Sequence, residues 1–136
     1  MTVTFRLLVV CYARYDPWFF DIYAPLLRPR PFFPSIGNHD DEVQQARPYR
    51  DIFVLPEHGA ASGYGDHAER FYSFDYRPVH FVAIDTELAF RDPARRQAQL
   101  AWLEQDLAAT SMPWRVAYRH RSPDAAHGLR RHAVQP

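Results

Sequence analysis

Twelve prolines in a chain of 136 residues divide the sequence into short segments and limit the length of any helix or strand. Proline lacks the amide hydrogen that the interior of a helix or sheet uses, so regular elements must largely fit between these positions. Apolar residues make up 47% of the chain, which is enough for one packed core. The sequence therefore predicts a single loop-rich domain over 1–136, built from short elements.

Composition also narrows the class of function. One cysteine, Cys11, excludes an internal disulfide framework and zinc modules that need several cysteines. The 16 basic and 16 acidic residues cancel, which argues against nucleic acid or an acidic membrane surface as the main partner. No apolar stretch approaches the ~20 residues that span a bilayer. The apolar run at 7–10 is shorter than the core of a signal peptide, so a cytoplasmic location is expected for the chain as it stands.

The clearest structural pattern lies in the second half of the chain. Alternating residues over 70–76 and 79–85, with Arg77-Pro78 between them, predict a β-hairpin. Asp92 followed by proline predicts the start of a helix over 92–109. We expect this helix to bury Leu100, Leu103 and Leu107 and to expose Arg95, Arg96, Glu104 and Asp106.

Weaker patterns predict the remaining elements. Apolar and β-branched runs predict strands at 2–10, 32–36 and 114–118. Asp16-Pro17 predicts a helix start, and Trp18, Phe19, Ile22, Tyr23 and Leu26 then share one apolar face. A short helix is expected near 40–47 and a long loop over 49–70. Together these elements predict an α/β fold with a mixed sheet.

Gly37-Asn38-His39-Asp40 follows the predicted strand 32–36 and holds residue types suited to metal and proton chemistry. Asn38 offers an amide oxygen, which suits hard or borderline divalent metals. His39 can contact a phosphate or donate a proton, and Asp40 can orient His39 from behind. The same four residues also fit an ordinary turn with a surface histidine, and four residues alone favour that simpler interpretation.

Longer stretches of the chain favour the functional interpretation of this motif over an ordinary turn. The residues 19–27 and 30–40 resemble the calcineurin-like metallophosphoesterases, and within them the bacterial branch near the purple acid phosphatases. The resemblance continues, in family order and with similar spacing, through 72–76, 79–87, 99–107, 114–120 and His127-Gly128. It implies an α/β sandwich that hydrolyses a small-molecule phosphoester. In that family two ions of iron, zinc or manganese clamp the phosphate and lower the pKa of a shared water.

The resemblance also assigns roles to particular residues. It implies that Asn38 and His120 are metal ligands and that His39 is the catalytic acid that contacts the phosphate. The family's early Asp-x-His motif and Gly-Asp motif have no counterpart in 1–15, which contain no aspartate or histidine, and no Gly-His-x-His follows. Two neutral ligands without a bridging carboxylate hold metal weakly. We therefore expect a truncated domain with an incomplete metal site and impaired or absent activity.

Two other functions remain open. A non-catalytic module could bind phosphate or another anion, since all 16 basic residues are arginine, which makes bidentate contacts that lysine cannot make. The arginines available for such charge-assisted bonds are Arg115, Arg119, Arg121, Arg130 and Arg131. A non-functional gene fragment would instead expose sheet edges and self-associate. Phosphate binding in the absence of metal would identify the anion-binding module, and self-association in size-exclusion chromatography would identify the non-functional fragment. The sequence leaves the oligomeric state open.

Overall fold

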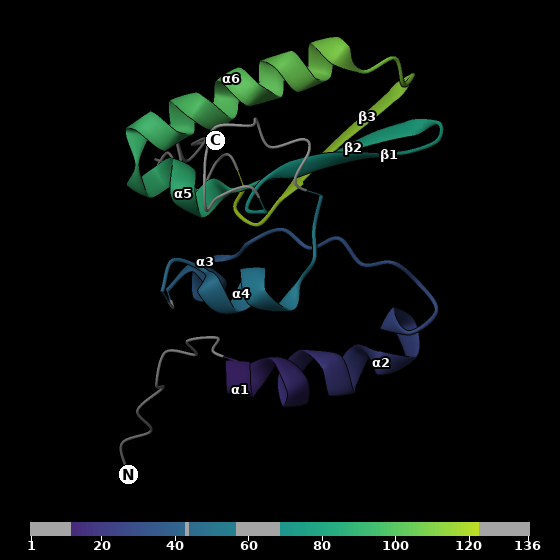
Figure 1. The fold of residues 1–136 in the computed structure, drawn as a ribbon, viewed down its shortest axis with the longest axis vertical. Helices are drawn as coiled ribbons and strands as arrows, with labels where there is room; N and C mark the ends of the chain where they lie inside the picture. The colour runs from purple at the N-terminus through teal and green to yellow at the C-terminus, as the bar shows by residue number, and fades with distance from the viewer. Residues whose placement is uncertain (1–11, 43, 57–68, 123–136) are drawn as a thin grey trace, which may run out of the picture.

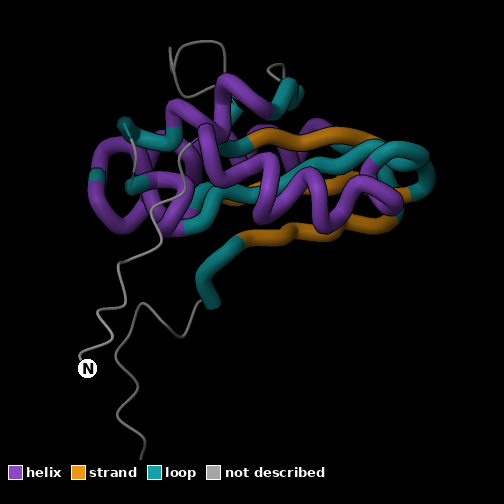
Figure 2. Tube along the Cα trace, turned by 90° about the horizontal axis from the view of Figure 1, so that it is seen from below, coloured by secondary structure: helices purple, strands orange, loops and turns teal. Residues whose placement is uncertain are grey.

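A three-stranded sheet lies at the centre of the computed structural model, which describes residues 12–42, 44–56 and 69–122. The strand order is β1 (Tyr72–Tyr76), β2 (Val79–Ile84) and β3 (Trp114–Arg119). β1 and β2 are antiparallel, whereas β2 and β3 are parallel. Helices lie on both sides of the sheet and run roughly along the strand direction (Figures 1 and 2). The predicted α/β class with a mixed sheet is confirmed.

The second half of the chain folds as its pattern predicts. Strands β1 and β2 form the hairpin, with Tyr72 opposite Ala83 and Tyr76 opposite Val79. Two helices, α5 (Thr86–Arg91) and α6 (Pro93–Ala109), then cross over to β3, as a parallel strand pair requires. Both helices have an aspartate cap. The Asp92 carboxylate accepts hydrogen bonds from the amides of Ala94 and Arg95 at 3.0 and 3.2 Å.

The sheet separates two apolar clusters because side chains alternate between its faces. On the α6 face, Phe71 and Val82 pack against Trp102. On the other face lies α4 (Arg47–Ile52), where Tyr49 packs with Ile36, Ala46, Leu55, Tyr72 and Ala83. In the view of Figure 1, α6 lies above the sheet, α5 lies beside its left end, and α1 to α4, within residues 12–52, lie below it.

The buried face of α6 differs from the one predicted. Leu100 is 45% exposed, while Trp102 is buried and Leu103 and Leu107 are partly buried against it. Asp106, expected in water, accepts a hydrogen bond from the Ser73 hydroxyl at 2.6 Å and contacts His80. The polar side chains on this face of the sheet need partners, so α6 turns a carboxylate toward them.

The first helical segment also differs from its prediction. Helix begins at α1 (Tyr12–Tyr15), passes through a π-helical turn η1 (Asp16–Phe20) and continues as α2 (Asp21–Leu27). Asp16 therefore lies inside the helix and is not its cap. A π-helical turn contains one residue more than an α-helical turn, so the side chains after it are rotated around the helix axis. An α-helical period of 3.6 residues counted from Asp16 therefore selects the wrong face of the helix. The exposed apolar side chains are accordingly Trp18, Ile22, Tyr23 and Leu26.

Aromatic contacts hold this segment to the rest of the protein instead. Phe53, which follows α4, has ring contacts at 5.7 Å with Tyr15 and at 6.0 Å with both Phe19 and Phe20. Phe32 joins the same group, at 5.2 Å from Phe19 and 6.0 Å from Phe53. The segment therefore packs through Tyr15, Phe19 and Phe20, and of the predicted apolar face only Phe19 takes part in these contacts with Phe32 and Phe53.

Residues 32–36 do not form the predicted strand, so Ile36 and Tyr118 do not end neighbouring strands. The segment lacks a ladder partner within the described ranges. Its backbone oxygen at Pro34 accepts hydrogen bonds from the hydroxyls of Tyr49 and Tyr72 at 2.8 and 2.5 Å. Side chains thus take the place of a sheet ladder at this position.

The region around 40–52 holds two short helices where one was predicted. These are α3 (Asn38–Asp41) and α4, separated by Gln44, Gln45 and Ala46, which all have positive φ. The predicted loop over 49–70 accordingly overlaps the end of α4. The predicted strand 2–10, the loop residues 57–68 and the end of the chain from 123 lie outside the described residues. Across the described ranges, no helix has the length and apolar character needed to cross a membrane.

His80 gives the fold a pH dependence that can be measured. Its buried ring lies between the carboxylates of Asp75 and Asp106, at 2.6 and 2.8 Å. Burial alone would lower the pKa of His80, but the two carboxylates more than offset it and raise this pKa above its ordinary value of 6.5. Because the folded-state pKa is the higher one, the stabilisation is fully present below pH 6.5 and is lost as pH rises through the folded-state pKa.

We therefore expect the free energy of unfolding, measured in urea, to fall as pH rises above 6.5. His80→Gln keeps a hydrogen-bonding side chain but removes the titration, so this part of the pH dependence should disappear. An identical pH profile in the variant would show that another group controls it.

Candidate functional site

Gly37 and Asp40 set the geometry of the turn that carries Asn38. Gly37 precedes α3, and its amide donates a hydrogen bond to the Asp40 carboxylate at 3.0 Å. The hydroxyl of Tyr15 donates to the other carboxylate oxygen of Asp40 at 2.6 Å. Burial and the nearby carboxylate raise the pKa of Tyr15, so the phenol keeps its proton for this bond. Asp40 thus holds the turn together through Gly37 and Tyr15.

Asn38 and His120 meet at the end of the sheet, although 82 positions separate them in the sequence. The Oδ1 atom of Asn38 lies 2.8 Å from Nε2 of His120. An amide oxygen accepts hydrogen bonds, so Nε2 carries the proton in this pair. The predicted juxtaposition of these two residues is confirmed, with Asn38 at the start of α3 and His120 directly after β3.

The close approach depends on the glycine before Asn38. A Cβ atom at position 37 would lie 3.1 Å from Nδ1 of His120 and 3.2 Å from the Asp40 carboxylate. Such contacts are tighter than ordinary van der Waals packing, so a side chain here would displace the imidazole ring. Gly37 therefore permits His120 to lie against the turn.

His39 lies beside the carboxylate of Glu42. Its side chain is 45% exposed, and the nearest acidic group is Glu42, at 3.6 Å from Nδ1. That distance is too long for a hydrogen bond. Nδ1 is itself shielded from solvent and has no hydrogen-bond partner in the part of the chain that the structure describes. His39 therefore combines an exposed ring with an unsatisfied nitrogen, while Asp40 bonds to Gly37 and Tyr15.

Two ion-pair clusters anchor the segments that carry the pair. On the His120 side, Arg121 makes a bidentate contact with the buried carboxylate of Glu87, at 2.6 and 2.9 Å. On the Asn38 side, Asp41 of α3 is bonded at 2.6 Å to the buried Arg70. Arg70 also binds Asp85, the cap of α5. Both segments are thus tied to α5, which the sequence pattern did not indicate.

His120 also lines an apolar cleft. The cleft has a volume of about 920 Å³, which is in the range of small-molecule sites. Apart from His120 and Arg30 its walls are apolar, and they comprise Phe19, Tyr23, Leu26, Leu27, Pro31 and Phe32. Tyr23, Leu26 and Leu27 of α2 therefore line one cleft together with His120.

The donor atoms present fit one metal ion better than two. The amide oxygen of Asn38 and Nε2 of His120 lie together in a hydrogen bond, and one ion could share them only after Nε2 had lost the proton that it donates to Asn38. A two-ion centre needs a bridging carboxylate and about four to six ligands for each ion. Within 12–42, 44–56 and 69–122 there is no group of three or more histidine, cysteine, aspartate or glutamate side chains that could hold a metal. The described residues therefore do not make up the expected two-ion centre.

Known proteins with similar sequences are phosphatases. Over 114 residues, or 79% of this chain, the sequence is 34% identical to purple acid phosphatase 23 of Arabidopsis thaliana. Over 117 residues it is 28% identical to human acid phosphatase type 7 and 27% identical to the mouse protein of that name. No family model and no solved structure matches the chain.

The matched region is only a part of each relative. The chain spans 23% of the plant protein and 25% of each mammalian protein, so about a quarter of their length. The aligned part nevertheless covers about 80% of this chain. Over most of its length, the chain is therefore purple acid phosphatase-like.

Proposed function

We propose that the chain carries part of the active site of a metal-dependent phosphoester hydrolase of the calcineurin-like superfamily. The observation that supports this most is the contact between Asn38 and His120 at 2.8 Å. These residues lie in the two segments that the resemblance singles out, and the fold brings them together from 82 positions apart. The relatives are phosphatases by name, so the substrate we propose is a small-molecule phosphoester.

Each residue of the proposed site has a distinct task. Asn38 and His120 would hold one divalent ion, whose positive charge attracts phosphate oxygens. His39, with its exposed ring and unsatisfied Nδ1, contacts the phosphate and donates a proton to the leaving oxygen. Asp40 keeps the turn rigid through its bonds to Gly37 and Tyr15. The remaining ligands of a two-ion iron, zinc or manganese centre have no counterpart among the described residues.

This proposal predicts that the chain alone hydrolyses an aryl phosphate slowly or not at all with manganese, zinc or iron. General acid catalysis by His39 supplies only about 10²–10⁴-fold acceleration. Phosphate monoesters need up to ~10²¹-fold, so a weakly held ion and one proton donor fall far short. The check is a metal-dependent rate measured beside Asn38→Ala. Rapid hydrolysis by the chain that is lost in Asn38→Ala would show that the chain does form a complete active site.

Metal binding tests the proposed ligands without relying on turnover. We expect substoichiometric Mn²⁺ to broaden the nuclear magnetic resonance signals of the His120 ring and the Asn38 side-chain amide. Asn38→Ala and His120→Ala should each weaken Mn²⁺ binding by at least about tenfold. His39→Gln is the matched control, since His39 is the proposed acid and not a ligand. Equal Mn²⁺ binding in all variants would refute the ligand assignment.

A further inference from the structure

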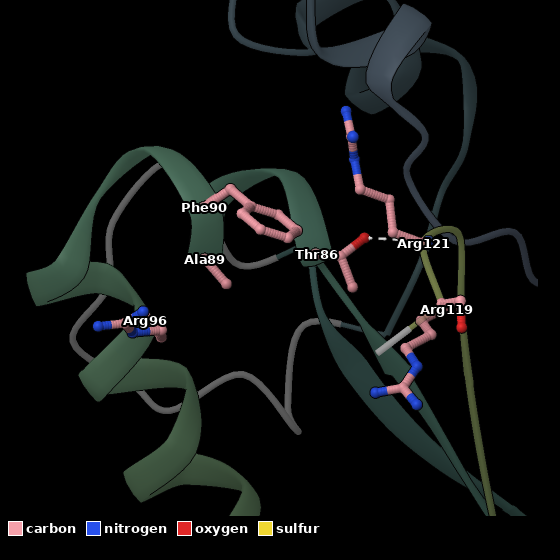
Figure 3. A pocket seen from close by; sticks show the side chains of 7 residues that line it. Thr86, Ala89, Phe90, Arg96, Arg119 and Arg121 are labelled. Carbon is pink, nitrogen blue, oxygen red and sulfur yellow. Dashed lines mark hydrogen bonds between the residues drawn. The ribbon is translucent and has the colours of Figure 1, made fainter. Parts of the chain in front are cut away.

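The apolar cleft that His120 lines lies beside the proposed hydrolytic site. Its volume is about 920 Å³. Nε2 of the same imidazole ring lies 2.8 Å from Oδ1 of Asn38, so His120 belongs to both the pair and the cleft. The pocket beside α5, drawn in Figure 3, is smaller, at about 210 Å³, and His120 is not among the residues that line it. A phosphoester bound at the Asn38–His120 pair therefore has the apolar cleft beside it.

Contacts outside the cleft set the position of His120. The backbone amide of Arg121 donates a hydrogen bond to the Thr86 hydroxyl at 3.3 Å, which is the dashed line in Figure 3. The Arg121 side chain is bonded to Glu87 of the same helix, α5. On its other side, the imidazole ring of His120 lies close to Gly37. The fold therefore holds the His120 wall of the cleft in place without a ligand.

Three aromatic rings form a connected wall of the same cleft. The ring centroid of Phe19 lies 5.4 Å from that of Tyr23 and 5.2 Å from that of Phe32. Phe19 also contacts Phe53 at 6.0 Å, which ties this wall to the end of α4. Because these rings already pack on one another, a ligand that lies against them loses less free energy in ordering them.

The exposed surface of the cleft favours an anion with an apolar body. Tyr23, Leu26 and Phe32 are 45%, 58% and 44% exposed, and an apolar group in the cleft removes part of this surface from water. Arg30 and His120 are the lining residues that can carry positive charge, and the described lining contains no carboxylate. A few polar groups in a mostly apolar cleft are typical of sites for small organic molecules.

We propose that this cleft is the subsite for the organic group of the phosphoester, and that this group is a large aromatic or other apolar one. This inference rests on the proposed function, because it places the phosphate at the Asn38–His120 pair. The rings of Phe19, Tyr23 and Phe32 contact the organic group. A small polar ester such as a polyol phosphate leaves these rings in water, so it binds more weakly.

Calorimetric titration of the whole chain with 1-naphthyl phosphate and with glycerol 3-phosphate tests this proposal. Each titration is run with Mn²⁺ and with a metal chelator. We expect 1-naphthyl phosphate to bind at least about tenfold more tightly than glycerol 3-phosphate in both buffers, because the apolar contact does not require a metal ion. Equal affinities of the two esters would overturn the proposal.

Leu26→Ser and Ile22→Ser form a matched pair on α2. Leu26 lines the cleft and Ile22 does not, yet they are 58% and 61% exposed, so neither substitution removes a core side chain. Leu26→Ser should weaken 1-naphthyl phosphate binding about fivefold and leave glycerol 3-phosphate binding unchanged. Ile22→Ser should change neither. Equal weakening in the two variants would show that the ester does not lie in the cleft.

Two further measurements separate this inference from its alternatives. The proposed function requires Mn²⁺ to tighten the binding of both esters and Asn38→Ala to remove that gain. If Mn²⁺ gives no gain, the ligand assignment fails, while the effect of Leu26→Ser still decides what occupies the cleft. Size-exclusion chromatography tests a second copy of the chain as the occupant. Self-association that Leu26→Ser abolishes, with ester binding unchanged, would overturn the subsite and make the cleft a contact between copies.

Discussion

Replacing Arg70 with methionine should lower the free energy of unfolding by about 3–5 kcal/mol, which is the usual cost of breaking a buried ion pair from one side. Arg70 is 1% exposed, and its partners Asp41 and Asp85 are 5% and 0% exposed. Its guanidinium group bonds to both carboxylates and, at 2.9 Å, to the carbonyl of Gln45. The substitution leaves two buried carboxylates without their main cation, and each must then be protonated or rehydrated.

The charge state of Arg70 supports this magnitude. Burial alone would lower the pKa of Arg70, but Asp85 and Asp41 more than offset it, so the pKa is raised and the side chain stays charged. Methionine is long and unbranched and fills much of the same space, which keeps any cavity small. Lost charge pairing, rather than lost packing, should therefore dominate the measured change.

Urea unfolding of Arg95→Met provides the matched control. Arg95 pairs with Asp92 at 3.2 Å on the surface, where the two side chains are 39% and 40% exposed. Exposed pairs of this kind contribute little, so the free energy of unfolding should change by no more than ~1 kcal/mol. If Arg70→Met cost no more than this control, the buried cluster would not be a main source of stability.

The sequence predicted those parts of the fold that depend on neighbouring residues. The hairpin follows from alternation on either side of Arg77-Pro78, and the start of α6 follows from the Asp92 cap. The meeting of Asn38 with His120 followed from the family resemblance, which orders segments far apart in the chain. Local pattern and resemblance together were sufficient for strands β1, β2 and β3 and for this pair, but the strand predicted over 32–36 does not form.

The parts that sequence reasoning missed depend on contacts between distant segments. Nothing local marks Arg70 as buried, because its burial depends on Asp41 and Asp85 from two other segments. An extended apolar run such as 32–36 becomes a strand only beside a partner, and here tyrosine hydroxyls satisfy Pro34 instead. The π-turn η1 likewise leaves no mark in the hydrophobic period, yet it rotates the residues that follow.

Replacing Trp102 with alanine should cost about 3–5 kcal/mol of unfolding free energy, as large-to-small changes of buried aromatic residues do. Trp102 is 4% exposed and packs on Phe71 with ring centroids 4.9 Å apart. Its side chain fills the layer between α6 and the sheet, beside Val82. Alanine would remove most of that contact and leave a cavity that the rigid sheet cannot close.

Leu100→Ala on the same helix separates this result from a general weakening of α6. Leu100 is 45% exposed, and alanine is the better helix former, so the free energy of unfolding should change by no more than ~0.5 kcal/mol. The spacing of the leucines predicts instead that Leu100 is buried, and therefore a large loss for Leu100→Ala as well. Urea unfolding of the two variants therefore decides which face of α6 is buried, and comparable losses would contradict the packing of Trp102 against Phe71.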